Sequence, residues 1–211
     1  MIKYISFDLD GTLADDTFDK LIWHEEVPKL YAAKHGMSLD NAKLHVYAEY
    51  YRALDIERVK TWTDIGYWFG RFGLQDWQQL VKDMKKHVFL YDDTIDALEY
   101  LSKKYKLIIV SNAGQKFLDV KLEAEGLRKH FDCIFSAPDT FGVPRKNKVM
   151  FQKILDKLGV KPDEIVHIGD DHELDYEVPT ALGIKSYHLV RSRSMKDKHI
   201  IHSLSELKSL L

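Results

Sequence analysis

Two aspartates stand two residues apart near the start of the chain, in the heptapeptide FDLDGTL (residues 7–13). The preceding residues are largely apolar and predict a β-strand buried in a parallel sheet. Burying both carboxylates inside a sheet would be prohibitive. We therefore expect the strand to stop at Asp8 and the chain to turn there, with Gly11 supplying backbone freedom. Asp8 and Asp10 would then lie at the carboxyl end of a strand, where open α/β sheets bind ligands.

A hydroxyl and an amide follow a second apolar run, residues 107–110, as Ser111 and Asn112. Both side chains can hold phosphate oxygens when they lie beside a helix N-terminus. The alternative is a plain strand end with an asparagine turn.

A basic loop, RKNK (residues 145–148), precedes another predicted helix. A lysine here would neutralise both a nucleophilic carboxylate and a transferring phosphoryl group as a compact point charge. The alternative is a solvated basic loop.

The acidic loop GDDHELD (residues 169–175) follows the apolar run 165–168. Its aspartates, Asp170, Asp171 and Asp175, again stand at the end of a predicted strand. This placement favours a ligand site over a solvated acidic surface, because several strand ends then bring their polar residues to one edge of the sheet.

Short apolar runs alternate with helical patterns, which is the signature of βαβ units and a parallel sheet. Strands are expected at 1–7, 107–110, 133–136, 165–168 and 184–189, with helices at 94–104, 115–125 and 148–158. Asp93 is expected to cap the first of these helices. Ser203 and Glu206 form a capping box that predicts a terminal helix over 204–211.

Residues 15–91 show helical periods and no strand pattern. All four tryptophans and 14 of the 25 aromatic residues fall in this segment, which indicates a core of its own. Ser38 and Asp76 are expected to cap two of its helices, and the tripeptide DDT at 15–17 and at 92–94 indicates a helix N-cap at each edge. The sequence thus predicts a domain of residues 1–14 and 92–211 with an inserted helical domain, 15–91.

Composition narrows the function classes. The chain has 211 residues, 45% of them hydrophobic, and its net charge of −2 argues against broad affinity for nucleic acid or an anionic membrane. No apolar stretch approaches the roughly 20 residues of a membrane span. The single cysteine, Cys133, cannot form an internal disulfide, and the N-terminus lacks the pattern of a signal peptide. A soluble cytoplasmic protein is expected, of an oligomeric state that the sequence does not indicate.

The heptapeptide at 7–13, Ser111, the basic loop and the run Gly-Asp-x4-Asp at 169–175 resemble, in this order, the motifs of the haloacid dehalogenase-like (HAD) hydrolases. Most members of this superfamily are phosphatases. The resemblance covers nearly the whole chain and implies a Rossmann-like three-layer α/β/α core with a parallel sheet. It also implies that residues 15–91 are a C1-type helical cap that selects the substrate. The tract 91–93 departs from the pattern, because many relatives carry Pro-Gly there.

The resemblance also implies roles for single residues. Asp8 would be the nucleophile and Asp10 the general acid and base. Mg²⁺ would be held by the carboxylates of Asp8 and Asp170 and by the backbone carbonyl of Asp10, because it prefers hard oxygen ligands. Asp175 would orient the lysine or a metal-bound water, and Asp171 would either do the same or bind the metal directly.

Phosphate binding would fall to Thr12, Ser111, Asn112 and a lysine of the basic loop. The superfamily's usual spacing to a helical phenylalanine, here Phe151, falls on Arg145. Lys146 is one residue late and Lys148 is three residues late. We choose Lys146 as the active-site lysine, with Lys148 as the alternative.

The expected function is Mg²⁺-dependent hydrolysis of a small phosphorylated metabolite through an aspartyl-phosphate. A phosphomutase of the same family is the nearest alternative. A dehalogenase is disfavoured because true dehalogenases lack the second aspartate, and a phosphonate hydrolase needs a cap lysine that forms a Schiff base. A non-catalytic binding protein would have no need for three converging carboxylates. Sugar phosphates, phosphoglycolate and nucleotide monophosphates all remain candidate substrates.

Overall fold

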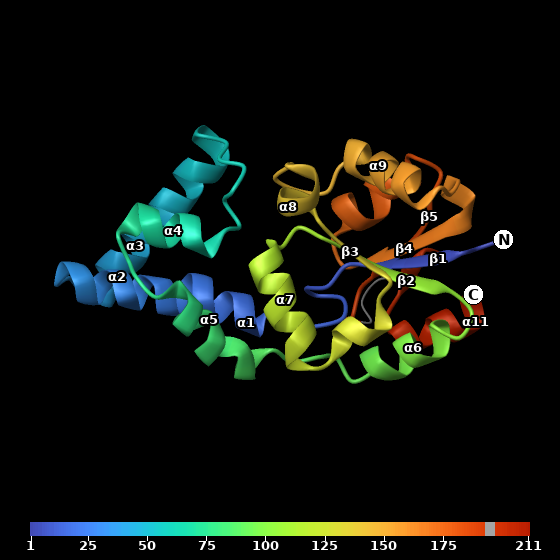
Figure 1. Ribbon diagram of the computed structural model, residues 1–211, viewed down its shortest axis with the longest axis horizontal. Coiled ribbons are helices and arrows are strands. Elements are labelled where there is room, and N and C mark those ends of the chain that lie inside the picture. Colours follow the sequence, from blue (N-terminus) through green and yellow to red (C-terminus); the bar gives the residue numbers. More distant parts are fainter. Residues whose placement is uncertain (193–196) are drawn as a thin grey trace.

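A six-stranded parallel sheet forms the centre of the molecule (Figure 1). The computed structural model describes residues 1–192 and 197–211. The strands are β1 (Tyr4–Phe7), β2 (Lys106–Ser111), β3 (Cys133–Ser136), β4 (Ile165–Gly169), β5 (Lys185–Leu189) and β6 (Ile200–Ile201). Their order across the sheet is β3-β2-β1-β4-β5-β6, and each neighbouring pair is parallel. The predicted parallel sheet is confirmed, and β6 is an addition, too short to leave a sequence pattern.

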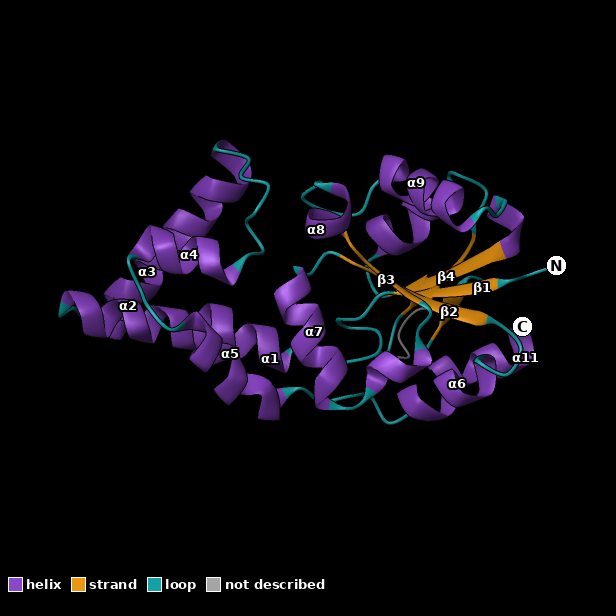
Figure 2. Ribbon diagram, viewed as in Figure 1, coloured by secondary structure: helices purple, strands orange, loops and turns teal. Residues whose placement is uncertain are grey.

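Helices cover both faces of the sheet, which confirms the predicted Rossmann-like three-layer core (Figure 2). On one face, Ile5 and Phe7 of β1 join a buried apolar cluster with residues of α6 (Thr94–Leu101), α7 (Gln115–Ala124) and α11 (Leu207–Leu210). On the other face, Ile108 and Val110 of β2 pack with residues of α9 (Lys148–Leu158) and α8 (Ala137–Phe141). Neighbouring residues of a strand therefore serve opposite layers, as the period of two requires.

Short helical turns complete this part of the chain. They are η4 (Leu127–His130), η5 (Pro162–Glu164), η6 (His172–Glu177), α10 (Val178–Thr180) and η7 (Leu204–Glu206). The capping box of Ser203 and Glu206 is present and opens η7, which continues into α11. The predicted terminal helix is therefore correct apart from its tighter first turn.

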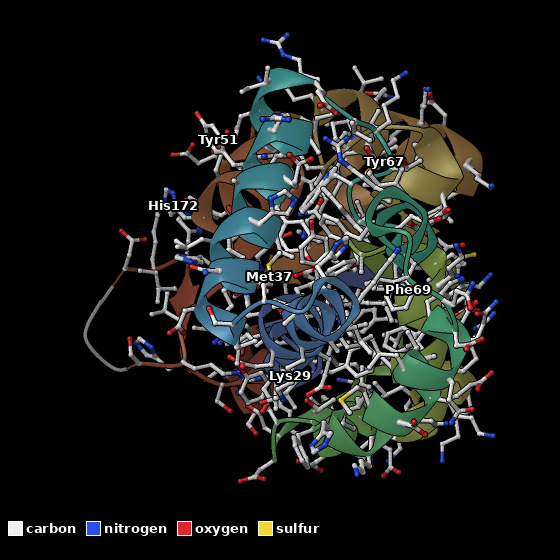
Figure 3. The ribbon with its side chains drawn as sticks, turned by 90° about the vertical axis from the view of Figure 1, so that its left-hand side faces the viewer. Lys29, Met37, Tyr51, Tyr67, Phe69 and His172 are labelled. Atoms are coloured by element: carbon white, nitrogen blue, oxygen red, sulfur yellow. The ribbon has the colours of Figure 1, made fainter. Side chains whose placement is uncertain are left out.

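Residues 15–91, here called the helical segment, contain helices and no named strand among the described residues. Its elements are α1 (Thr17–Lys20), η1 (Leu21–Glu26), α2 (Val27–His35), α3 (Leu39–Tyr51), η2 (Arg52–Ile56), α4 (Ile65–Phe72), α5 (Trp77–Met84) and η3 (Lys85–His87). Figure 3 looks onto this segment, with Lys29 of α2, Tyr51 of α3 and Phe69 of α4 labelled. Its aromatic residues form a buried cluster of their own, which includes Trp68 and Phe72.

The two connections between the helical segment and the sheet lie side by side. Ala14 and Leu90 form an antiparallel bridge, and Tyr91 N–H donates to the Leu13 carbonyl at 3.1 Å. Helix α7 faces both parts, because its Phe117 belongs to the cluster of the helical segment and its Leu118 to that of the sheet. The division of the chain at residues 15 and 91 stays a prediction.

Two of the expected helix caps are wrong in detail. Asp93 and Asp76 occupy the N-cap positions of α6 and α5, but neither side chain accepts a capping hydrogen bond. Asp76 adopts a left-handed conformation, with φ at 61°, which differs from the extended backbone of an ordinary N-cap. At the first edge, Asp15 accepts from the Thr17 N–H at 3.0 Å, in place of Asp16. The predicted cap at Ser38 is present, with Asn41 N–H as donor.

The Asp93 carboxylate instead binds the C-terminal part of the chain. It accepts hydrogen bonds from Ser203 Oγ at 2.7 Å and from the Leu204 N–H at 2.8 Å, and it pairs with Arg191 at 3.1 Å. This ties the start of α6 to η7. Asp93 therefore bonds to residues distant in the sequence instead of capping α6.

We expect Asp93→Ala to lower the free energy of unfolding by roughly 1.5–3 kcal/mol, because hydrogen bonds to a charged group are lost and their donors are left unpaired. Asp92→Ala is the matched control, since Asp92 is exposed one residue away. Urea denaturation of both variants checks this. Equal effects of the two substitutions would contradict the anchoring role.

Candidate active site

The first strand delivers two carboxylates to the edge of the sheet. The Asp8 N–H still donates to the Ile168 carbonyl of β4 at 2.9 Å, and the chain then turns so that Leu13 N–H reaches back to the Leu9 carbonyl. Gly11 sits in this turn with φ at 78°. A Cβ at Gly11 would lie 2.1 Å from an oxygen of Asp170, so glycine is needed for the close approach as well as for the turn.

Three carboxylates converge at this edge. Oxygen atoms of Asp8, Asp170 and Asp175 all lie within 4.8 Å of one another. Burial raises the pKa of Asp8 well above its usual value, and the Asp175 and Asp170 charges raise it further, although Lys146 opposes the shift. Partial burial and the Asp175 charge raise the pKa of Asp170 to about 6. Burial and the neighbouring carboxylates therefore disfavour the ionised forms of Asp8 and Asp170 in the protein alone.

Lys146 lies in the middle of the acidic group. Its Nζ is 3.0 Å from Asp8 Oδ1 and donates a short hydrogen bond to Asp175, and the side chain is buried. Burial would lower the Lys146 pKa, but the two carboxylates outweigh it and raise that pKa above its usual range. Lys148 and Arg145 are exposed. The geometry thus places Lys146, rather than either neighbour, beside Asp8.

Asp175 is held by groups that keep it ionised. Burial alone would raise its pKa, yet the Lys146 ammonium and the hydrogen bond to His167 lower it to about 2. His167 Nε2 is 2.9 Å from Asp175 Oδ1, and the Asp171 N–H donates to Asp175 Oδ2 at 3.2 Å. Asp175 is thus bonded to the Lys146 ammonium as well as to His167. The Asp171 side chain accepts from the Leu174 N–H at 2.9 Å and shapes the loop.

His167 lies buried in β4, within the strand predicted at 165–168, and it also supports the site. Burial lowers its pKa despite the neighbouring Asp175, so the ring is neutral near pH 7. A neutral ring has one donor and one acceptor. We assign Nε2–H as the donor to Asp175 and Nδ1 as the acceptor from Ser6 Oγ, 2.8 Å away. No sequence motif predicted that His167 would support Asp175.

The expected phosphate-binding residues lie at the same edge, with differing partners. Thr12 is buried, and its hydroxyl donates to Asp170 Oδ1 at 3.4 Å. Ser111 Oγ accepts from the Ala113 N–H at 3.0 Å in the turn after β2. Asn112 Oδ1 accepts from the Lys146 N–H at 2.7 Å and so fixes the loop that carries the lysine.

The tract 91–93 has a structural role that explains its departure from the family pattern. The Arg191 guanidinium lies 3.5 Å from the centre of the Tyr91 ring and pairs with Asp93. The same guanidinium donates to the Thr12 carbonyl at 2.6 Å. Tyr91 and Asp93 therefore hold an arginine that supports the loop of the first aspartates.

A cavity of about 480 Å³ lies between this edge and the helical segment. Asp10, Asp19 and Asn112 line it together with many aromatic rings. The aromatic residues around it are Trp23, Tyr50, Tyr51, Trp62, Trp68 and Phe117. Asp10 is thus the one of the first two aspartates that reaches the cavity wall. The cavity is of the size that small-molecule sites have.

Lys121 was missed by sequence reasoning. Its side chain is 1% exposed, and its Nζ lies 2.5 Å from Asp10 Oδ1 and closer still to Asp19. Burial raises the pKa of Asp19 to about 6, with Lys121 opposing the shift and Asp10 adding to it. The sequence does contain an indication of this role, because a charged Lys121 falls on the otherwise apolar face of α7 with Phe117, Leu118 and Leu122.

A family model describing haloacid dehalogenase-like hydrolases matches residues 2–183. The chain belongs to this family and is a hydrolase.

Individual relatives agree with this. The GMP/IMP nucleotidase YrfG of Escherichia coli is 31% identical over 185 residues, which cover 87% of this chain and 81% of the relative. The human haloacid dehalogenase-like hydrolase domain-containing protein 3 is 28% identical, with 98% and 92% covered. A HAD phosphatase from Thermococcus onnurineus has a similar structure, with a TM-score of 0.82, 26% identity, and 99% and 97% of the two chains covered.

No helix within residues 1–192 and 197–211 combines the length and the apolar character that crossing a bilayer requires.

We expect Lys146→Met to lower the free energy of unfolding by about 3–5 kcal/mol in EDTA, because it removes the cation from buried carboxylates. Lys148→Met is the matched control and should change stability by no more than about 0.5 kcal/mol, since Lys148 is exposed. Urea denaturation followed by circular dichroism measures both. A larger loss of stability for Lys148→Met than for Lys146→Met would indicate that Lys148, and not Lys146, is the buried cation.

Proposed function

We propose that this protein is a Mg²⁺-dependent phosphatase that hydrolyses a small phosphorylated metabolite through a phosphorylated Asp8. One observation carries the proposal. The buried Asp8 carboxylate is paired with Lys146, lies beside Asp170, and adjoins a loop whose second aspartate, Asp10, lines the cavity. This is the arrangement that in-line phosphoryl transfer needs, a positioned nucleophile, charge neutralisation and a nearby proton carrier.

The donor set fits Mg²⁺. Asp8 and Asp170 offer hard carboxylate oxygens within one coordination sphere's reach, and the Asp10 backbone carbonyl is the further ligand that the family pattern suggests. The raised pKa values of Asp8 and Asp170 support a bound cation, because added positive charge would stabilise both ionised carboxylates. When bound, Mg²⁺ would offset the charge of the carboxylates and of the substrate phosphoryl group.

The reaction proceeds in two displacements. A carboxylate oxygen of Asp8 attacks phosphorus, the bond from phosphorus to the leaving oxygen breaks, and Asp10 gives its proton to that oxygen. Asp10 then takes a proton from water, whose oxygen attacks the phosphorus of the aspartyl-phosphate. Breakage of the bond to Asp8 releases inorganic phosphate and restores the carboxylate.

The remaining residues hold the phosphoryl group. Lys146 adds a fixed positive charge beside Asp8, and Ser111 and Asn112 offer a hydroxyl and an amide from the end of β2. Thr12 supports the site through its hydrogen bond to Asp170. Asp175 and Asp171 act through the lysine and the acidic loop.

The cavity favours a substrate with a flat ring. Its wall is rich in aromatic side chains, which stack on planar groups, and Asp55, Thr63 and His24 provide polar atoms among them. The relative from E. coli is named a GMP/IMP nucleotidase. We therefore place purine nucleoside monophosphates first among the candidate substrates, ahead of sugar phosphates and phosphoglycolate.

A phosphatase screen tests the proposal. With Mg²⁺, we expect turnover of nucleoside monophosphates, and a lower KM for them than for ribose 5-phosphate, because the ring adds contacts in the cavity. EDTA should abolish turnover. Asp8→Asn should lose both turnover and the phosphoenzyme that acid quenching traps from the wild-type protein.

Asp15→Asn is the control for Asp8→Asn, because Asp15 lies on the connection to the helical segment and bonds to Thr17. Release of phosphate by Asp8→Asn protein at a near-normal rate would contradict the assigned nucleophile. Isomerisation of a substrate without free phosphate would instead indicate a mutase.

A further inference from the structure

Helix α7 places a lysine in the interior where its neighbours are apolar. Phe117, Leu118 and Leu122 share its buried face, and the Lys121 side chain is 1% exposed. A lone buried ammonium would be strongly disfavoured. Its position is possible because two carboxylates meet it, Asp10 at 2.5 Å and Asp19 at a shorter distance.

The three charged groups come from three parts of the fold. Asp10 belongs to the loop after β1, Lys121 to α7 and Asp19 to α1 of the helical segment. The rings of Phe18 and Phe117 enclose the ammonium, with their centres 5.4 and 5.9 Å from Nζ. Asp10, Asp19 and Phe117 all line the cavity, so the ammonium lies directly behind its wall.

Hydrogen-bond chemistry then fixes which oxygen of Asp10 can carry a proton. An ammonium group only donates, so Asp10 Oδ1, its partner, has to accept. The carbonyl oxygen of a protonated carboxyl group still accepts a hydrogen bond, so the geometry of the contact does not require Asp10 to be ionised. When Asp10 is protonated, its proton must lie on Oδ2.

We propose that Lys121 is a positioning residue for Asp10, which holds Oδ1 so that Oδ2 exchanges protons with the leaving oxygen and the water. Asp19 in turn anchors the Lys121 ammonium to α1. The orientation of Asp10 therefore depends on the helical segment being seated against α7, a contact that Phe18 and Phe117 also make edge to face. This role rests on the proposed phosphatase function, in which Asp10 is the proton carrier.

A purely structural ion pair would behave differently. Its loss would reduce the folded fraction or the rate for all substrates by one factor. Loss of an oriented proton carrier has its largest effect on substrates with poor leaving groups, which need protonation as the bond breaks. The dependence on the leaving group therefore separates the two roles.

The test uses the full chain with Mg²⁺ and two substrates, a nucleoside monophosphate with an alkoxide leaving group and 4-nitrophenyl phosphate with a good one. We expect Lys121→Met to lower kcat for the nucleotide roughly 10²-fold or more and kcat for the nitrophenyl ester far less, with little change in KM. Asp10→Asn should show the same pattern.

Lys116→Met is the matched control. Lys116 lies on the same helix and also pairs with the helical segment, through Asp64 at 2.7 Å and the Trp77 ring, neither of which takes part in the proposed mechanism. Its ratio of the two kcat values should equal that of the wild-type protein. If Lys121→Met folds poorly, Lys121→Met combined with Asp19→Asn removes one unneutralised charge, and this double variant should fold yet keep the altered ratio.

Equal loss of kcat on both substrates in a folded Lys121 variant would overturn the positioning role and leave the phosphatase proposal intact. An unchanged kcat for the nucleotide would do the same. Absence of Mg²⁺-dependent turnover in the wild-type protein would overturn the phosphatase proposal itself, and the Lys121 role with it.

Discussion

Repulsion between carboxylates governs this site. Asp8, Asp170 and Asp175 meet at one edge of the sheet, and Asp10 and Asp19 meet close by, so that five acidic groups share two buried lysines. Like charges in a region of low dielectric repel strongly. Each lysine pairs with two carboxylates, and the neutral His167 donates a further hydrogen bond to Asp175. The negative charge that remains is what a divalent cation and the protons of catalysis would balance.

The fold meets this constraint through its parallel strands. Strands β1, β2 and β4 lie side by side, so the residues that follow them must converge. This is why strand patterns and strand-end residues were enough to predict the parallel sheet and the convergence of Asp8 with Asp170, whereas the three-layer core was predicted from the family resemblance. Two glycines permit the close approach, since a Cβ at Gly11 or Gly169 would lie within 2.2 Å of Asp170 or Asp175.

Features that depend on distant partners were not predictable in the same way. Asp93 looks like a helix cap in the sequence, but its partners are Arg191, Ser203 and Leu204, which no local pattern reveals. Spacing favoured Arg145 over Lys146, and only the path of the loop, fixed by Asn112, shows which cation turns inward. The sequence shows Lys121 as a charge on an apolar helical face, but its partners Asp10 and Asp19 lie about a hundred residues earlier in the chain.

A crystal structure determined in magnesium would show whether Asp8 and Asp170 jointly bind Mg²⁺ at the edge of the sheet. One ion is expected at about 2.0–2.1 Å from a carboxylate oxygen of each residue and from the Asp10 carbonyl oxygen. An ion bound elsewhere, or Asp8 and Asp170 facing separate solvent regions with no ion between them, would contradict this expectation.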